Sequence, residues 1–423
     1  MKRRAPIFLM MLMSLFVAEI FSQHFDYRLE EAPALSWNGL PLFDARMMAL
    51  GGISLTAAGP FAAVLNPALT PSPEKVMLGA SFGGMHHEAF QYWGVNQGVK
   101  TKDTPLSNRN FLLSGLAAAF KTGGIRLSTG WVLSALRQFP SFTFRQEYEY
   151  DQYDAYSGDF AGRENTFFAA AALELTRNLD IGLKLAYISG QRQVEMIDFS
   201  RYYYLIDNEW QIKDLAIRQH ETHERSSIAA SLGAVLKISP NWTVGAAFVY
   251  PFQGKVKRTV SRIFDNRTDQ FDITDRQTGT DTLYQPAKAL LGTTIHIPLN
   301  AQKRLLLGAE AALTSWSGYK YVFFGDTMPR DMRDTVALAL GVEYGSLSAN
   351  RDLFFRLGFR LDPQPLREPA TTLKALTGGL GLRLGSIGAD VGAAYYSGSA
   401  GGVRQDHFVL NTTLHICLKG GKQ

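Results

Sequence analysis

Residues 304–316 read RLLLGAEAALTSW, and the two faces of this stretch differ in kind. Every odd position from Leu305 to Leu313 is leucine or alanine, whereas the even positions include Gly308 and Glu310. Side chains of a β-strand alternate between the two faces of a sheet, whereas a helix would mix these positions. The stretch therefore predicts a long β-strand with one apolar face.

The same alternation recurs in DTVALALGVEY at 334–344 and in LFFRLGFRL at 353–361. Soluble strands usually have five or six residues, whereas a tilted strand that crosses a bilayer needs about nine to eleven, a length that these runs reach. The opposite faces carry small, polar and charged side chains, which suit an enclosed interior. The charged ones are Arg126, Glu174, Lys184, Lys237, Lys288, Glu310, Glu343, Arg356, Arg360, Arg383 and Asp390. The pattern favours a membrane-spanning barrel over a secreted β-sandwich, which would have to bury one face of every long strand without a helical layer.

Short turns and long polar segments alternate along the chain. The short turns, rich in Gly, Pro, Asn or Asp, are at 121–124, 177–180, 239–242, 298–303, 348–352 and 385–388. The longer polar segments are at 137–163, 193–223, 255–283 and 317–333, with shorter ones near 96–108, 362–370 and 398–405. Short turns on one side and long loops on the other are typical of outer-membrane barrels.

The segments between these connections predict about fourteen strands. They are about 75–95, 109–121, 124–136, 164–177, 179–193, 224–238, 241–254, 284–297, 303–316, 334–346, 352–361, 371–385, 387–397 and 405–418. The number is even and leaves both termini on the short-turn side. GGMHHE at 83–88 interrupts the first strand, so we expect a bulge or bend there. The predicted fold class is an all-β, transmembrane antiparallel β-barrel.

The N-terminus has the features of an export signal. Three cations at 2–4 precede an apolar run at 7–20, and the small Ser22 offers a cleavage position. A membrane-anchoring helix is the alternative, but the run is shorter than the roughly 20 residues that a bilayer span needs. We predict a signal peptide at 1–22, an N-terminal hatch at 23–74, an outer-membrane barrel at 75–418 and a C-terminal tail at 419–423.

Composition argues against several other classes. The 423 residues carry a formal net charge of +5, spread thinly without basic runs, so we expect no nucleic-acid partner. The single cysteine, Cys417, excludes an internal disulfide and a multi-cysteine zinc site. An enzyme is not expected, because no catalytic triad emerges and His415 lies about 13 Å along its strand from Asn411. No metal or other cofactor is indicated.

A barrel of this size needs a plug. About fourteen tilted strands enclose a bore of roughly 14 Å backbone radius, which side chains of the wall cannot fill. The segment 23–74 is too irregular for a strand and is placed to fold back inside the bore. Asn66 and Pro67 predict a turn, because Asn can hydrogen-bond its own backbone and Pro fixes φ. This turn would let the plug leave the bore before the chain enters the wall.

The segment ARMMALGGISLTAAGPFAAVLNPALTP at 45–71 resembles the hatch of the FadL family of outer-membrane transporters for long-chain fatty acids and other hydrophobic molecules. Later blocks resemble that family in the same order: NWTVGAAFVYPFQGK at 241–255, AEAALTSWSGYK at 309–320, VALALGVEYG at 336–345 and FRLGFRLDPQPL at 355–366. The resemblance implies a fourteen-stranded barrel with a hatch inside its lumen. The family's mature N-terminus and its closing aromatic residue are not matched.

The resemblance also implies hatch and gating residues. Gly51 and Gly52 match the glycine pair of the hatch, and Asn66, Pro67 and Ala68 match its N-P-A motif. The alternative is that these residues only anchor the plug and contact no ligand.

For a carboxylate ligand, the candidate binding residues are the inward cations Lys288, Arg356 and Arg360, which could form charge-assisted hydrogen bonds with a head group. The alternative is that they belong to an ion-pair network of the wall itself, for which Glu310 and Glu343 are available partners.

The function that the resemblance implies is passive transport of long-chain fatty acids or other hydrophobic small molecules across the outer membrane of a Gram-negative-type bacterium, gated by hatch movement. The expected partners are a fatty acid-like ligand and outer-membrane lipid, and the chain is expected to be a monomer. The alternative is a PorV-like barrel that acts as a protein-interaction subunit of a secretion system. A transporter needs an apolar pocket next to the hatch, whereas a secretion subunit needs a large protein-facing surface.

Overall fold

The computed structural model describes residues 43–57, 59–72, 76–90, 105–147, 153–206, 209–266, 271–318, 320–323, 326–328, 332–348, 351–363, 365, 372–400 and 403–418. The predicted signal peptide, the first part of the predicted hatch and the C-terminal tail lie outside these residues. Within the described ranges, no helix is both long and apolar enough to cross a membrane.

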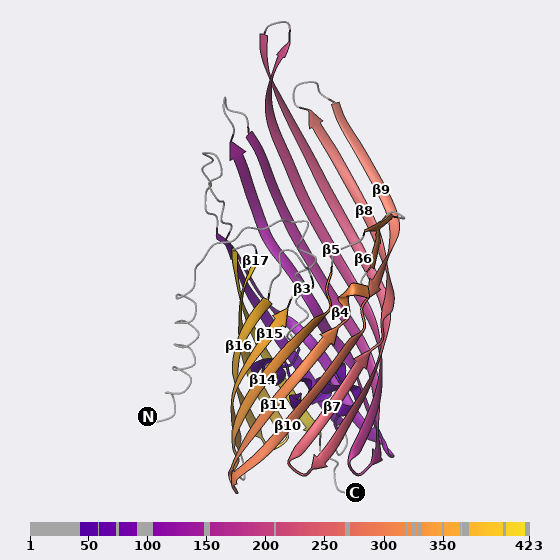
Figure 1. Cartoon of the computed structure of the whole chain (residues 1–423), viewed down its shortest axis with the longest axis vertical. Helices are drawn as coiled ribbons and strands as arrows, with labels where there is room; N and C mark the ends of the chain where they lie inside the picture. Colours follow the sequence, from indigo (N-terminus) through magenta and orange to yellow (C-terminus); the bar gives the residue numbers. More distant parts are fainter. Residues whose placement is uncertain are drawn as a thin grey trace, which may run out of the picture.

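Fourteen antiparallel strands form the closed wall of a barrel (Figure 1). In chain order they are β1 (Val76–Phe90), β2 (Pro105–Thr122), β3 (Ile125–Glu147), β4 (Tyr153–Thr176), β5 (Leu179–Ile206), β6 (Glu209–Ser239), β7 (Trp242–Val249), β10 (Lys288–Asn300), β11 (Lys303–Thr314), β14 (Thr335–Ser346), β15 (Asp352–Pro363), β16 (Thr372–Leu384), β17 (Ile387–Ala400) and β18 (Val403–Leu418). The sheet closes where β1 pairs with β18, from Val76↔Leu418 to Glu88↔Asp406. The predicted fold class and strand number are confirmed.

Further strands raise the wall on one side. They are β8 (Phe252–Asn266), β9 (Phe271–Gln285), β12 (Lys320–Phe323) and β13 (Asp326–Met328), and the short η6 (Trp316–Gly318) precedes β12. Because β7 ends at Val249, the rest of β6 pairs with β8, from Ser227↔Gly254 to Leu215↔Asn266. The wall is therefore much taller over β3–β6, β8 and β9 than over β14–β17 (Figure 1).

The long polar segments that the sequence predicts as loops are largely strand. β5 and β6 pair without interruption as far as Ile206↔Glu209, and β8 and β9 occupy most of 255–283. These segments carry polar residues at both odd and even positions, so their sequence lacks the alternation of apolar and polar residues that identified the other strands. The backbone groups nevertheless pair along the ladder, which depends on neighbouring strands and not on an apolar face.

The bulge or bend that the sequence predicts at 83–88 is not found there. β1 runs through these residues in continuous pairing with both neighbours. The register shift is between Ser81 and Phe82 in the pairing with β2, where Ser114 is the extra residue. The bulge is thus on β2 and not in the glycine-rich part of β1.

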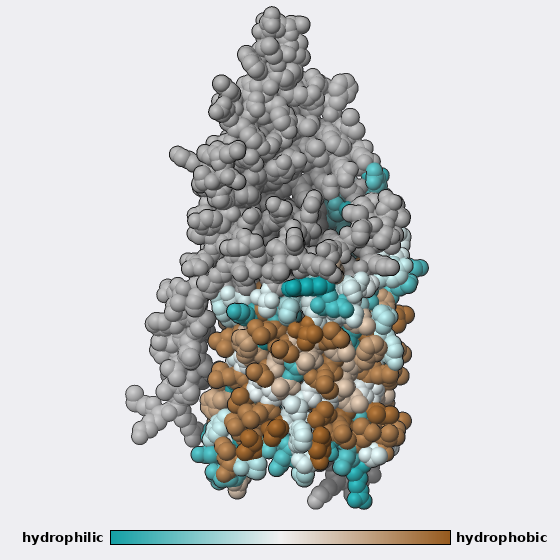
Figure 2. All heavy atoms as spheres, in the orientation of Figure 1, coloured by the Kyte–Doolittle hydropathy of each residue, from teal (hydrophilic) through white to brown (hydrophobic). Residues whose placement is uncertain are grey.

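The outer and inner faces of the wall differ as predicted. Outward Ile228 and Leu357 are 70% and 68% exposed, and such side chains form an apolar band bounded by hydrophilic rows (Figure 2). Inward Glu343, Arg356 and Arg360 are 1%, 3% and 4% exposed. The strands therefore present one face to hydrocarbon and the other to an enclosed interior.

Residues 43–72, which we call the hatch, lie inside this wall. Their elements are α2 (Ala45–Ala49) and the 3₁₀ turns η2 (Ser54–Thr56), η3 (Pro60–Val64) and η4 (Pro67–Leu69). α2 contacts β15–β18, η2 contacts β10 and β11, η3 contacts β1–β4, and η4 contacts β4–β6. In outer-membrane barrels the short turns face the periplasm, so we call that end periplasmic and the tall end extracellular.

An ion-pair cluster joins β6 to β8 on the extracellular side of the apolar band. Glu221 Oε2 accepts a hydrogen bond from Arg258 Nη2 at 2.8 Å and lies 2.9 Å from His223 Nε2. Burial by itself would raise the pKa of Glu221, but the hydrogen bond with His223 and the charge of Arg258 outweigh it and lower this pKa to about 2.

This cluster predicts a pH-dependent pairing of β8. Because the folded pKa of Glu221 lies below the ordinary 4.5, the stabilisation is complete above pH 4.5 and is lost as the pH falls toward about 2. We expect amide hydrogen exchange in β8, corrected for the intrinsic rate, to accelerate over that range in detergent-solubilised protein. Glu221→Gln should remove the acceleration, and an equal acceleration in this variant would contradict the assignment.

Candidate functional site

The glycine pair Gly51-Gly52 ends helix α2. Asp44 caps the start of this helix, with Met47 N–H donating to Asp44 Oδ1 at 2.9 Å. At the other end Gly51 N–H donates to Met48 O at 3.1 Å and Gly52 N–H donates to Met47 O at 2.8 Å. These are the two bonds of a Schellman motif, and the φ angles of 76° and 84° explain why both residues are glycine.

Asn66 joins the N-P-A motif to the wall. Its Oδ1 accepts a hydrogen bond from Ala68 N–H at 3.0 Å, the local bond expected from the sequence, and Pro67 begins η4. Its Nδ2 donates to Ala246 O on β7 at 3.2 Å and to Ala234 O on β6 at 3.5 Å. One side-chain amide therefore caps the hatch turn and also bonds two strands of the wall.

Inward glycines let the hatch approach the wall closely. A Cβ on Gly233 would lie 2.1 Å from Asn66 Oδ1, and one on Gly182 would lie 2.4 Å from the carbonyl carbon of Pro67. The inward glycines with a hatch atom among their nearest neighbours, which we call the glycine seat, are Gly79, Gly115, Gly182, Gly233, Gly245, Gly308, Gly341, Gly358, Gly379 and Gly392. They are spread over ten strands, so the seat almost encircles the hatch.

Carboxylates of the wall hold the first half of the hatch. Arg46 donates from Nε and Nη2 to the two oxygens of Glu343, each at 2.9 Å. Ser54 donates to Glu310 Oε2 through its backbone N–H at 2.8 Å and also through its hydroxyl. Glu310, predicted as a partner for wall cations, therefore bonds the hatch.

Neutral side chains and one lysine hold hatch backbone at other points. Ser128 donates a hydrogen bond to Pro60 O, and Lys184 donates one to Val64 O. Thr377 accepts from Gly51 N–H and donates to Ala49 O, and Thr413 accepts from Ala45 N–H. Because the hatch is irregular, many of its backbone groups have no partner within the hatch itself, and the wall supplies one.

Arg356 lies on the periplasmic side of the hatch, two residues before Gly358 on β15. Its Nε donates to Glu343 Oε2 at 2.7 Å, and its Nη1 donates to Asp390 Oδ1 at 2.6 Å. Its side chain is 1% exposed. Glu343 therefore accepts hydrogen bonds from one arginine of the hatch and one of the wall.

Lys288 and Arg360 lie together on the extracellular side of the hatch. Both line a cavity of about 30 Å³, which also touches Trp316 and Asp362. Arg360 Nε lies 3.6 Å from Asp362 Oδ2. The structure thus brings two of the three predicted head-group residues together and places Arg356 on the other side of the hatch.

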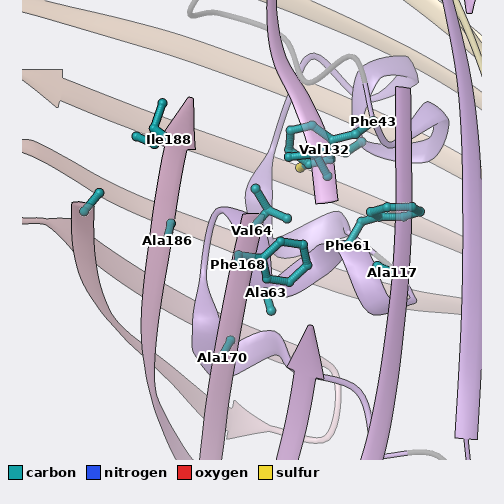
Figure 3. Packing of buried hydrophobic residues seen from close by; sticks show 12 residues of the cluster. Phe43, Phe61, Ala63, Val64, Ala117, Val132, Phe168, Ala170, Ala186 and Ile188 are labelled. Atoms are coloured by element: carbon teal, nitrogen blue, oxygen red, sulfur yellow. The ribbon is translucent and has the colours of Figure 1, made fainter. Parts of the chain in front are cut away.

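Apolar side chains cover the extracellular face of the hatch. Phe61 and Val64 of the hatch pack with Val132, Phe168 and Ile188 of the wall (Figure 3). Further buried inward residues on this side are Ala186, Ala229, Ala247, Leu290, Ala312, Ala337, Leu373, Ala375, Ala394, Tyr396 and Val409. We call this set the apolar lining.

Inward positions on the periplasmic side are richer in charge, although apolar side chains such as Phe354 and Leu306 are buried among them. Titratable side chains there are Arg126, Asp180, His296, Arg304, Glu343, Arg356, Arg383, Asp390 and His415. The sequence pattern identifies the inward face of each strand but not the level at which the hatch crosses it. The division of the lumen into an apolar and a charged part is therefore visible only once the hatch is in place.

Comparison with known proteins agrees with this architecture. A family model described as BamG matches residues 44–410. A solved FadL homologue from Pseudomonas aeruginosa aligns with a TM-score of 0.59 at 15% identity, over 90% of this chain and 99% of that one. The toluene transporter TodX of Pseudomonas putida gives 0.58 at 13% identity, over 93% and 99% of the two chains. The monoaromatic hydrocarbon channel CymD aligns with a TM-score of 0.57 at 16% identity, over 89% of this chain and 98% of that one.

No curated protein matches the sequence. At identities this low the structural likeness shows the fold, and at that level the predicted resemblance to the FadL family is confirmed.

Proposed function

Because this chain belongs to the BamG family and has the barrel fold of FadL-type structures, we propose that it admits hydrophobic small molecules from the extracellular side and passes them by diffusion beside the hatch. No energy source is needed. The barrel would act in the outer membrane of a Gram-negative-type bacterium, as the strand length and the fold suggest.

The observation that carries this proposal is the division of the lumen at the hatch. A hydrophobic solute that leaves water for apolar side chains gains about 25 cal/mol for each Å² buried. The apolar lining offers such a surface on the side from which external solutes arrive, with Phe61 and Val64 as its floor. The charged periplasmic side favours release into water.

The hatch is held unequally, which suggests where passage occurs. α2 and η2 are bonded to the carboxylates of Glu343 and Glu310, whereas no carboxylate is bonded to η3 in the described part of the chain. η3 is held by the apolar packing of Phe61 and Val64 and by the hydrogen bonds that Ser128 and Lys184 donate to its carbonyl groups. A hydrophobic ligand can replace apolar contacts but cannot replace a carboxylate. We therefore assign the gating movement to η3, between η2 and Asn66 as the fixed points on either side.

The ligand class follows from the same lining. Aromatic hydrocarbons need only the apolar surface, whereas a fatty acid also needs a cation for its carboxylate. Lys288 and Arg360 lie at the edge of the lining and could supply this cation, and the carboxylate of the fatty acid would compete with that of Asp362 for Arg360. Arg356 has two carboxylate partners and lies beyond the hatch, so we assign it to hatch retention.

A substitution in the apolar lining tests the proposal. Ile188→Gln places an amide among apolar groups, and we expect it to weaken ligand binding about tenfold. Ile188→Leu keeps the surface apolar and should bind as the native protein does. Binding of radiolabelled palmitate and toluene to detergent-purified protein, and their uptake into proteoliposomes, measure the effect. Native uptake no faster than in protein-free liposomes would overturn the transport function.

The tall extracellular wall favours a second candidate. β5 and β6 have 28 and 31 residues, about three times what crossing a membrane requires. Such a wall gives a PorV-like interaction subunit a protein-facing surface. Co-purification of a secreted protein that is lost when the β8–β9 hairpin is deleted, together with absent uptake, would favour this candidate over transport.

A further inference from the structure

A polar pocket lies on the outer face of the tall wall, just above the apolar band. It has a volume of about 570 Å³ and is formed by residues of β4, β5, β6, β8 and β9. Arg163, Lys255 and Lys257 line it, and the only carboxylate among its lining residues is that of Glu224. We call it the rim pocket.

The three cations are available to a ligand. Arg225, a fourth basic residue of the lining, is paired with Glu164. Within the described part of the chain, Arg163, Lys255 and Lys257 have no ion-pair partner. Glu224 lies opposite Lys257 in the β6–β8 pairing and offsets part of this charge, so the lining keeps an excess of positive charge, which suits an anion.

The position of the rim pocket matches that of lipid head groups. Tyr187 lines its lower edge, 48% exposed, with the ring of Phe167 beside it at 6.4 Å. Outward aromatic residues mark the edge of the hydrocarbon layer in membrane barrels. Ile228, 70% exposed, follows Ser226 of the pocket by two residues and lies already in the apolar band.

β4, β5 and β6 also line an apolar groove below the pocket, together with β3, β7 and β10. The groove has a volume of about 780 Å³; its lining includes the exposed Leu183, Leu232 and Phe248 and no residue of the hatch, so it opens outward. We call it the wall groove. From Ser189 of the pocket to Leu183 of the groove, β5 covers about 20 Å, or roughly 15 Å of depth at the usual tilt. That depth is about half the hydrocarbon core, the length of one leaflet.

We propose that the rim pocket and the wall groove together bind one phosphorylated lipid of the outer leaflet. Its phosphate lies among Arg163, Lys255 and Lys257, and an acyl chain follows the wall into the groove. Arg163 lies across three strand spacings, about 14 Å, from Lys257, so its long side chain and those of Lys255 and Lys257 reach the phosphate oxygens from two sides through charge-assisted hydrogen bonds. The groove adds apolar burial that a free phosphate cannot use. The site is on the outside of the barrel and is independent of transport through the lumen.

Native mass spectrometry of the full barrel in detergent tests this proposal. The added probes are bisphosphorylated lipid A, the same lipid after phosphatase treatment, phosphatidylethanolamine and inorganic phosphate. We expect bisphosphorylated lipid A to bind most tightly, and the double variant Lys255→Gln/Lys257→Gln to weaken it about 30-fold. The control Lys121→Gln/Lys303→Gln removes two exposed lysines at the periplasmic end and should leave binding unchanged.

The outcomes are distinct. Equal binding of lipid A before and after phosphatase treatment would overturn the phosphate assignment. Inorganic phosphate that binds as tightly as lipid A would show an anion site without a lipid. An equal loss of binding in the control would show a general effect of charge. Both double variants lie outside the hatch and the apolar lining, so each should retain the native gel mobility of the folded barrel.

Discussion

Replacing Glu343 with glutamine is expected to destabilise the folded protein by about 3 kcal/mol, because two buried arginines then lose a carboxylate. Both hydrogen bonds that the Arg46 side chain makes within the described part of the chain go to Glu343, so the hatch loses this ion pair with the wall. Arg356 keeps Asp390, which places the effect at the lower end of the usual range for a broken buried pair. Urea unfolding in detergent micelles, followed by the mobility of unheated protein on gels, measures the loss.

The control for this variant is Glu164→Gln. Glu164 pairs with Arg225 on the extracellular part of the wall, where both side chains are partly exposed, and removing such a pair costs about 1 kcal/mol or less. Trypsin should also cut the hatch at Arg46 faster in Glu343→Gln than in the native protein. Equal unfolding midpoints for the two variants would contradict a structural role of Glu343 in hatch retention.

Replacing Gly182 with valine is expected to unseat the N-P-A motif. The new Cβ would lie 2.4 Å from the carbonyl carbon of Pro67 and 2.5 Å from Ala68 N, which are backbone atoms that a side-chain rotation cannot move. Overpacking of this kind costs about 1–3 kcal/mol, and the hatch turn must shift to relieve it. We expect an increased ion conductance in planar bilayers, because the displaced turn leaves an opening beside β5.

Gly124→Val is the matched control for the same chemical change. Gly124 lies in the turn between β2 and β3, and a Cβ there would meet no atom within 4 Å. Its conductance should equal that of the native barrel. A Gly182→Val barrel that folds with native conductance would show that the hatch tolerates displacement at this seat, against the assignment of Asn66 and Pro67 as a fixed end.

The sequence predicts the wall well where one face meets hydrocarbon and the other does not. Alternation in 334–344 and 353–361 identifies β14 and β15 and places Glu343, Arg356 and Arg360 inside. It fails for β8 and β9, because strands beyond the membrane have polar residues on both faces and lack the contrast that the periodicity needs. The hatch motifs at 51–52 and 66–68 are also visible, since a Schellman end and an Asn-capped turn are local in sequence.

The candidate site could be predicted only in part. The sequence places Lys288, Arg356 and Arg360 on inward faces but groups them as one ligand site. The structure separates Arg356 from the other two by the thickness of the hatch, and it shows that Glu310 and Lys184 bond hatch residues far from them in sequence. The sequence shows that inward positions such as 182 and 233 are glycine and have no side chain. It does not show which hatch residues approach them there.

The sequence by itself therefore determined the barrel, its strand number and the presence of a plug, because each of these follows from the period-two pattern or from a few adjacent residues. Only the tertiary structure decided which groups meet at the hatch, where the lumen changes from apolar to charged, and which cations stay unpaired on the outer rim. The physical reason is that these features depend on contacts between residues distant in the chain. One strand's periodicity shows which way a side chain points, but the height of the hatch within the bore is set by its summed contacts with twelve or more strands of the wall.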